Sequence, residues 1–89
     1  MLKKELTIKN KTGLHARPAA LLVKTTGKFK SEIFISKDGY KVNGKSIMGV
    51  MTLAAESGSV IEITIDGPDE EQAMLALEDL IHNKFYEDY

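Results

Sequence analysis

The chain has no cysteine and no tryptophan, and only two of its 89 residues are proline. The lack of cysteine excludes disulfides, thiolate metal sites and cysteine nucleophiles, and it is typical of proteins in a reducing compartment. No stretch approaches the roughly 20 apolar residues of a membrane span, and the first six residues have no secretory apolar core. We therefore expect a cytoplasmic protein without membrane insertion.

An excess of charge of one sign is lacking as well. Lys and Arg together number 12 and Asp and Glu number 13, which gives a net charge of -1. Such a balance does not point to nucleic acid or to an anionic membrane as a partner, so partners must be recognised by local patches. The chain is too short to bury two separate cores, and we predict a single domain over residues 1–89.

The spacing of apolar residues predicts the secondary structure. Alternation with period two indicates strands, and spacing of three to four residues indicates helices. The predicted strands cover residues 2–8, 32–36, 40–43 and 60–66, and the predicted helices cover residues 16–27, 47–54 and 70–83. This β-α-β-β-α-β-α order predicts an α+β fold, with helices on one face of a four-stranded antiparallel sheet.

The first predicted helix has one face for the core and one for solvent. The buried face is expected to contain Ala19, Leu22, Val23 and Thr26. The opposite face contains Arg17, Leu21 and Lys24, with Ala20 at its border. The helix is therefore predicted to leave a leucine in water beside two cations.

The second predicted helix has more apolar residues than one face can bury. Ser46 stands at its N-cap position, and its inward face is expected to contain Val50, Leu53 and Ala54, flanked by Ile47. Met48 lies away from that face and Met51 at its edge. Surface methionines suit a patch that receives partners of different shapes, but a small domain could also bury them, and both interpretations stay open.

The last predicted helix begins with a capping signal. Asp69 and Gln72 have the spacing of a capping box, and Glu70 and Glu71 suit the positive first turn. Its buried face is expected to contain Ala73, Leu77, Leu80 and Ile81. The remaining residues, 85–89, are predicted to form a loosely held tail.

The stretch from Thr12 to Ala20 carries the chemistry that stands out. Here a turn leads into the first helix, with Pro18 in its first turn and His15 just before it. A helix N-terminus has free N–H groups and a partial positive charge, so it binds anions and disfavours a protonated imidazole. A neutral imidazole can attack a phosphoryl group, and Arg17 would be a local counter-charge for the product. This pattern predicts a site that accepts and passes on phosphate.

Simpler explanations exist for each of these residues. A lone histidine such as His15 is often only a capping or surface residue, and Arg17 could be a solvated side chain. A metal site is not expected, because the second histidine, His82, lies near the end of the last helix and no Cys or His has ligand spacing. A hydrolytic triad that uses Ser46 is poorly supported, because nothing brings a base and an orienting acid to it.

Two segments together resemble a known family. Residues 13–19, with the sequence GLHARPA, and residues 45–51, with the sequence KSIMGVM, are similar to the two signature segments of HPr. HPr is the histidine-containing phosphocarrier of the bacterial sugar phosphotransferase system. The resemblance covers essentially the whole chain. The family often has a glycine after Leu53, where this chain continues with Ala54 and Ala55, so the resemblance does not define the end of the second helix.

The resemblance implies a fold and a function. The fold would be an open-faced β-sandwich with strand order 1-4-2-3 and three helices on one face. His15 would take a phosphoryl group, on its tele or pros nitrogen, from phospho-Enzyme I and pass it to IIA domains of sugar permeases. The backbone of Ala16 and Arg17 would bind the phosphate, with no cofactor and no metal, and the protein would act as a monomer.

Ser46 also has two interpretations. Serine is a common N-cap, but the resemblance implies regulatory phosphorylation by an HPr kinase/phosphorylase, with a catabolite-control transcription factor as a further partner. The expected partner surface consists of Ala20, Leu21, Lys24, Ile47, Met48, Gly49 and Met51. The competing function is a non-transferring regulatory module of the Crh type, a relative known for lacking the active histidine that this chain has.

Overall fold

Alternating isoleucines build the centre of the sheet. In the computed structural model, which describes residues 1–87, strand β4 (Val60–Asp66) buries Ile61, Ile63 and Ile65 on one face. β4 pairs antiparallel with β1 (Leu2–Thr7) on one side and with β2 (Glu32–Lys37) on the other. The period-two pattern therefore places the most apolar strand between two neighbours, where both of its edges are hydrogen-bonded.

A tight hairpin adds the fourth strand. Asp38 and Gly39 both have positive φ, 53° and 83°, which is the geometry of a two-residue turn between twisted antiparallel strands. It joins β2 to β3 (Tyr40–Asn43), whose Val42 lies opposite Ile35. The resulting order β1-β4-β2-β3 confirms the fold class and the order implied by the resemblance.

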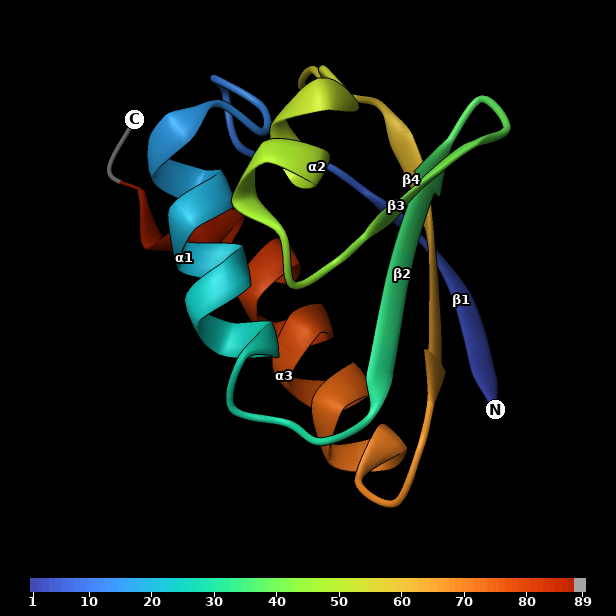
Figure 1. Cartoon of the computed structure of the whole chain (residues 1–89). Helices are drawn as coiled ribbons and strands as arrows, with labels where there is room; N and C mark the ends of the chain where they lie inside the picture. The colour runs from blue at the N-terminus through green and yellow to red at the C-terminus, as the bar shows by residue number, and fades with distance from the viewer. Residues whose placement is uncertain (88–89) are drawn as a thin grey trace.

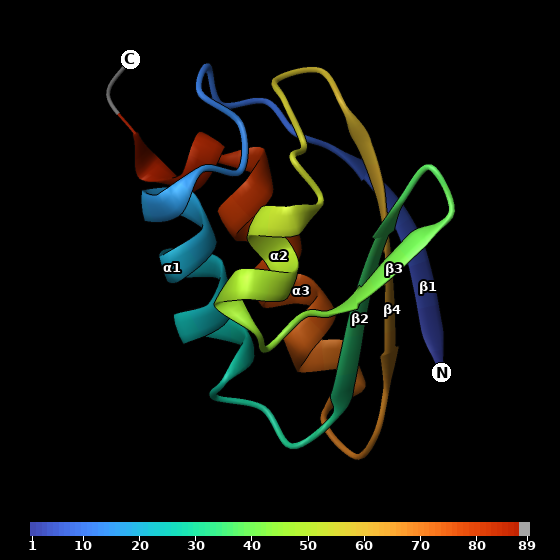
Figure 2. The same ribbon diagram turned by 45° about the horizontal axis from the view of Figure 1, so that its top comes forward.

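All three helices cover the same face of the sheet, as Figures 1 and 2 show. They are α1 (Ala16–Thr26), α2 (Ile47–Thr52) and α3 (Glu70–His82). Their apolar faces meet the isoleucines of β4 and β2 in one core. None of the helices within residues 1–87 is long and apolar enough to cross a membrane.

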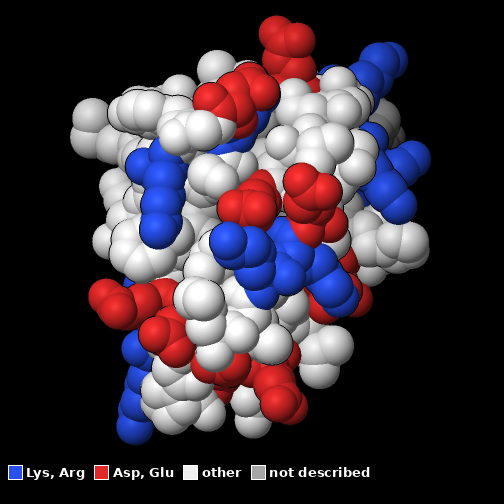
Figure 3. All heavy atoms as spheres, turned by 90° about the vertical axis from the view of Figure 1, so that its right-hand side faces the viewer, with Lys and Arg blue, Asp and Glu red and all other residues white. Residues whose placement is uncertain are grey.

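The other face of the sheet is open to solvent. Figure 3 shows this side, where positive and negative groups lie next to each other near the centre, with uncharged atoms around them. Lys41 Nζ lies 4.7 Å from the ring centroid of Phe34 on the neighbouring strand, which is cation–π geometry. This side of the molecule offers no broad basic surface.

The second helix is shorter than predicted. It ends at Thr52 with Leu53 as its C-cap, and the next residue, Ala54, has a φ of 50°. Ala54 is exposed, whereas Ala55 is buried. Assigning Ala54 to the inward face was wrong, because the helix ends before this residue and its own left-handed backbone turns the chain, so that Ala55 is buried in its place.

The predicted capping box of α3 was also wrong. Asp69 is the N-cap residue, but its carboxylate makes no cap hydrogen bond. It accepts hydrogen bonds from the backbone N–H of Lys30 at 2.8 Å and from the backbone N–H and hydroxyl of Ser31 at 2.9 and 2.5 Å. Glu70, rather than Gln72, reaches back to the backbone N–H of Gly67 at 3.1 Å. Asp69 therefore ties the loop before β2 to the start of α3.

The predicted loose tail is docked as far as the structure describes it. Phe85 is 3% exposed and belongs to the core, within a short 3-10 turn, η1 (Lys84–Tyr86). Glu87 hydrogen-bonds to the turn that precedes α1. The tail prediction was wrong for residues 85–87, because a charged chain end does not reveal that Phe85 anchors it in the core. The last two residues of the predicted tail lie outside the described range.

Candidate functional site

A constrained turn brings the chain into α1. Gly13 has a φ of 71°, and a side chain there would put its Cβ 2.4 Å from the carbonyl oxygen of Ala55. Leu14 is buried, and its N–H donates to the same carbonyl oxygen at 2.8 Å. The segment after α2 therefore fixes the turn, and the turn fixes where the next residue begins a helix.

His15 is the N-cap residue of α1. Its backbone is extended, with φ −86° and ψ −169°, and its carbonyl accepts the first helical hydrogen bond from Ala19 at 2.9 Å. Its side chain makes no capping hydrogen bond and is 44% exposed. The structure thus presents the imidazole to solvent at the start of the helix.

The first turn of α1 leaves N–H groups for a ligand. The first N–H groups of a helix have no intrahelical partner. In this helix Pro18 has no N–H and Ala19 already donates to His15, so Ala16 and Arg17 supply the remaining backbone donors. The first turn contains no acidic side chain, and Arg17 is exposed. An anion beside His15 would meet two backbone donors and the positive end of the helix, in the same turn that carries Arg17.

Three residues near His15 were missed by the sequence analysis. Asn10 is fully buried, and its Nδ2 donates to the carbonyl of Gly13 at 2.8 Å and to Glu87 Oε1 at 2.9 Å. The hydroxyl of Thr12 donates to the same carboxylate oxygen at 3.2 Å. Glu87 Oε2 lies 3.6 Å from His15 Nε2. The turn residues Asn10 and Thr12 gave a local turn signal, but nothing local connected them to a carboxylate more than 70 positions away.

The residues of the expected partner surface fall on α1 and α2, which contact each other. Ala20, Lys24, Ile47 and Met51 are exposed, and Met48 is 76% exposed. Gly49 is half-buried. Of the two interpretations of the methionines, the structure therefore favours the surface patch.

Leu21 differs from its prediction as a leucine in water. It is half-buried and packs against the core from the border of α1. Elements distant in the sequence pack against α1, and helical periodicity alone does not reveal how much of a border residue they cover. One part of the Leu21 side chain therefore packs against the core, and the rest is exposed as part of the expected partner surface.

Ser46 caps α2 as predicted. Its backbone is extended, and its hydroxyl accepts a hydrogen bond from the N–H of Gly49 at 3.1 Å. The side chain is half-buried, in contrast to the exposed ring of His15. The hydroxyl is therefore already used as a helix cap.

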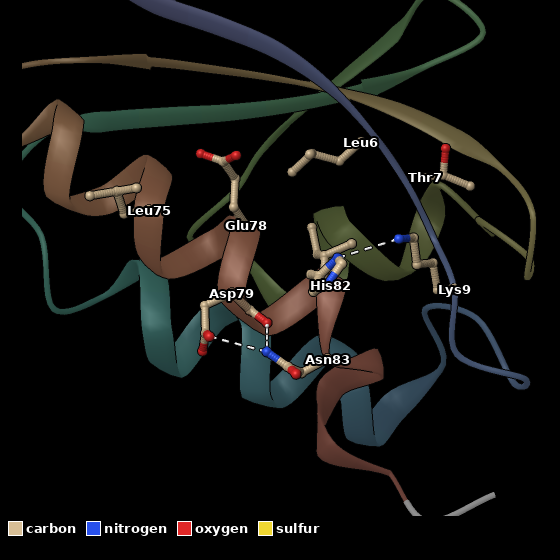
Figure 4. A pocket seen from close by; sticks show the side chains of 9 residues that line it. Leu6, Thr7, Lys9, Leu75, Glu78, Asp79, His82 and Asn83 are labelled. Carbon is tan, nitrogen blue, oxygen red and sulfur yellow. Dashed lines mark hydrogen bonds between the residues drawn. The ribbon is translucent and has the colours of Figure 1, made fainter.

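His82 lines a pocket that does not include His15. It lies at the end of α3 in a pocket of about 360 Å³ between that helix and β1 (Figure 4). Its Nδ1 is 3.4 Å from Lys9 Nζ, and on the same helix Asn83 Nδ2 donates to Asp79. No cluster of His, Cys, Asp or Glu in the described chain has the arrangement of a metal site.

Comparisons with known proteins agree with this architecture. The family model described as the PTS HPr component phosphorylation site matches residues 2–83. The phosphocarrier protein HPr of Xylella fastidiosa (strain Temecula1) is 57% identical over 99% of both chains. The HPr-like protein Crh of Halalkalibacterium halodurans is 58% identical over 86% of this chain and 92% of its own.

A solved structure gives the same result. The crystal structure of HPr-C-His from Thermoanaerobacter tengcongensis has a TM-score of 0.96 with this chain, at 54% identity and with complete coverage of both chains. The match thus includes the turn before α1, both signature segments and the described C-terminal turn. The chain belongs to the HPr family of phosphocarrier proteins of the phosphotransferase system.

Proposed function

We propose that His15 accepts a phosphoryl group from phosphohistidyl Enzyme I and donates it to IIA domains of sugar permeases. The observation that carries this proposal is the position of His15 as an N-cap residue whose ring does not cap the helix. An N-cap side chain normally satisfies the first N–H groups of its helix. Here these donors stay available beside an exposed nucleophile.

The chemistry needs few groups. A ring nitrogen attacks phosphorus, the bond to the donor's histidine breaks, and its electron pair returns to that histidine. The N–H groups of Ala16 and Arg17 and the Arg17 guanidinium stabilise the transferred dianion, and they are in place before the reaction. A carrier must also release its phosphate, and 1.4 kcal/mol of extra binding would shift the transfer equilibrium about tenfold. The partly exposed ring suits a balanced transfer.

We place the docking of both partners on the surface formed by Ala20, Leu21, Lys24, Ile47, Met48, Gly49 and Met51. This surface lies on α1, which begins next to His15, and on the neighbouring α2, and its exposed methionines can adapt to partners of different shape. The protein would act as a cytoplasmic monomer, because each transfer requires the same face to be free for the next partner.

The decisive experiment measures acid-labile phosphate on the protein after incubation with phosphoenolpyruvate and Enzyme I. We expect His15→Ala to abolish it while the circular dichroism spectrum and thermal midpoint stay close to those of the original chain. His82→Ala is the matched control, because His82 is the other histidine and its ring faces Lys9 in the pocket against β1. Normal phosphate uptake by His15→Ala would end the proposal.

We further propose that phosphorylation of Ser46 regulates transfer. A phosphate at a helix N-terminus is favoured electrostatically, so the modification would keep α2 folded while adding charge beside Met48. An HPr kinase/phosphorylase would add it, and a catabolite-control transcription factor would read it. A chain that acts only in this way, as a Crh-type module, is the alternative, and the exposed His15 argues against it as the sole function.

Ser46→Asp separates these roles. We expect it to slow phosphate uptake from Enzyme I and to strengthen binding to the regulator. Ser46→Ala is the control, because it removes the hydroxyl without adding charge. If Ser46→Asp behaves like the original chain in both assays, the regulatory role is lost and the carrier role is untouched.

A further inference from the structure

The C-terminal segment returns to the start of α1, as both ribbon views show (Figures 1 and 2). Lys84, Phe85 and Tyr86 have φ values of 56°, 56° and 55°, a left-handed conformation that side chains disfavour. Phe85 is buried in the core, and the hydroxyl of Tyr86 donates to Asp79 on α3. Packing and hydrogen bonds therefore hold the segment in a backbone conformation that it would not adopt by itself.

The turn before α1 holds the carboxylate of Glu87. Oε1 accepts hydrogen bonds from Asn10 Nδ2 at 2.9 Å and from the Thr12 hydroxyl at 3.2 Å. The side chain is only 4% exposed, so these donors replace much of the water that a carboxylate would otherwise bind. Its second oxygen, Oε2, faces Nε2 of His15 at 3.6 Å.

We propose that Glu87 is a positioning residue for His15, which fixes the tautomer of the ring and thereby the nitrogen that reacts. This inference rests on the proposed function. A carboxylate beside Nε2 favours a proton on that nitrogen, and a neutral ring with its proton on Nε2 has its lone pair on Nδ1. The separation of 3.6 Å is longer than a hydrogen bond, and such contacts often shorten when a reaction partner docks. The carboxylate also repels a phosphoryl group from Nε2, so phosphate goes to Nδ1.

The same contact acts in both directions of transfer. On loading, the Nδ1 lone pair forms the bond to phosphorus, the donor's P–N bond breaks towards the donor, and Nε2 keeps its proton. The product is a phosphoimidazolium, whose positive ring is stabilised by Glu87. On unloading, the P–Nδ1 bond breaks, its electrons return to Nδ1, and the ring leaves as neutral imidazole. No proton has to enter or leave the ring in either step.

A purely structural role for Glu87 makes a different prediction. If the carboxylate only ties the C-terminal turn to Asn10 and Thr12, removing it would loosen that turn and leave the His15 tautomer unchanged. Glu87→Gln distinguishes the two, because its amide oxygen can still accept from Asn10 and Thr12 while the charge beside His15 is lost. The amide signal of Phe85 reports in the same sample whether the turn stays docked.

The experiment is nitrogen-15 NMR of the His15 ring in the full chain, followed by the rate of phosphate uptake from Enzyme I. In the original chain we expect the Nε2–H tautomer, and phosphate on Nδ1. Glu87→Ala and Glu87→Gln should both shift the ring towards the other tautomer, with uptake slowed roughly tenfold in Glu87→Ala and less in Glu87→Gln. Glu5→Gln, which neutralises an exposed carboxylate of β1, should change neither.

Ring signals in Glu87→Gln that match those of the original chain would overturn the inference, as would phosphate found on Nε2. The tautomer measurement needs no phosphorylation, so its failure is separate from that of the proposed function. If the original chain takes up phosphate normally and only the Glu87 effects are missing, the carrier role stands without this positioning residue. If the original chain takes up none, the proposed function itself fails.

Discussion

The starts of α1 and α2 differ in how the N-cap side chain treats the free backbone N–H groups of the first turn. Both begin with an extended N-cap residue, and in each case the next turn has backbone N–H groups without helical partners. Ser46 turns its hydroxyl inwards and satisfies the N–H of Gly49, whereas His15 turns its ring outwards and satisfies none. The start of α2 is stabilised by its own cap, whereas the start of α1 lacks that stabilisation, as the proposed phosphate binding requires.

This difference depends on the turn before α1, and breaking the turn should have the largest effect. Gly13→Ala combines a disfavoured φ with a Cβ only 2.4 Å from the backbone oxygen of Ala55, which cannot move like a side chain. We expect a loss of about 2–4 kcal/mol in the free energy of unfolding. Urea unfolding followed by circular dichroism measures it, since the chain has no tryptophan for fluorescence.

Gly39→Ala is the control for Gly13→Ala. It has a similar φ of 83° but nothing within 4 Å of the added Cβ, so it should cost only about 1 kcal/mol. Equal losses in the two variants would mean that the close approach of residues 13 and 55 does not hold the turn.

The two helix starts themselves are compared by one pair of substitutions. Ser46→Ala removes a cap hydrogen bond and should lower the free energy of unfolding by about 1 kcal/mol. His15→Ala removes a side chain that caps nothing, so its effect should stay within about 0.5 kcal/mol while its effect on phosphate uptake is complete. A stability loss in His15→Ala as large as that in Ser46→Ala would show that both starts are structural.

The end of α2 offers a stabilising substitution. Ala54 has a φ of 50°, a conformation that glycine adopts without strain. Its side chain is exposed, so Ala54→Gly removes little packing, and we expect a gain of about 0.5 kcal/mol after the greater entropy of glycine in the unfolded chain is included. Ala20→Gly, an exposed alanine within α1, should instead lose stability. A loss in both variants would contradict the role of the backbone angle.

The sequence predicted those parts of the molecule that local patterns determine. The alternating strand at residues 60–66 and the serine cap of α2 each depend on neighbours within a few positions, and the structure confirms them. Ala54 was misplaced because nothing in its own side chain signals a left-handed backbone.

The predictions that failed depend on contacts between distant segments. Asp69 has the spacing of a capping box, but its carboxylate accepts hydrogen bonds from the backbone N–H and hydroxyl of Ser31 instead. Glu87 looked like part of a charged, loosely held end, yet Phe85 anchors it against the core and brings it to His15. Similarity of the signature segments indicated His15 and Arg17 as candidate site residues, and it contained no information about a carboxylate on another element.

The start of α3 provides a third case for the comparison and the smallest expected effect. Hydrogen bonds, first from the Ser31 hydroxyl and then from the Lys30 backbone, lower the pKa of Asp69 from 3.8 to about 2. A lowered pKa in the folded state means that the carboxylate contributes stability above its ordinary pKa and loses it as the pH falls towards about 2. Asp69→Asn should therefore be less stable than the original chain at pH 5, and the difference should shrink between pH 4 and pH 2.

Urea unfolding at several pH values measures this, with Glu71→Gln as the control because Glu71 is an exposed acid in the same helical turn. If the difference in the free energy of unfolding between Asp69→Asn and the original chain does not depend on pH, the charge of Asp69 does not contribute to it. In that case neutral hydrogen bonds hold the start of α3, as they hold the start of α2.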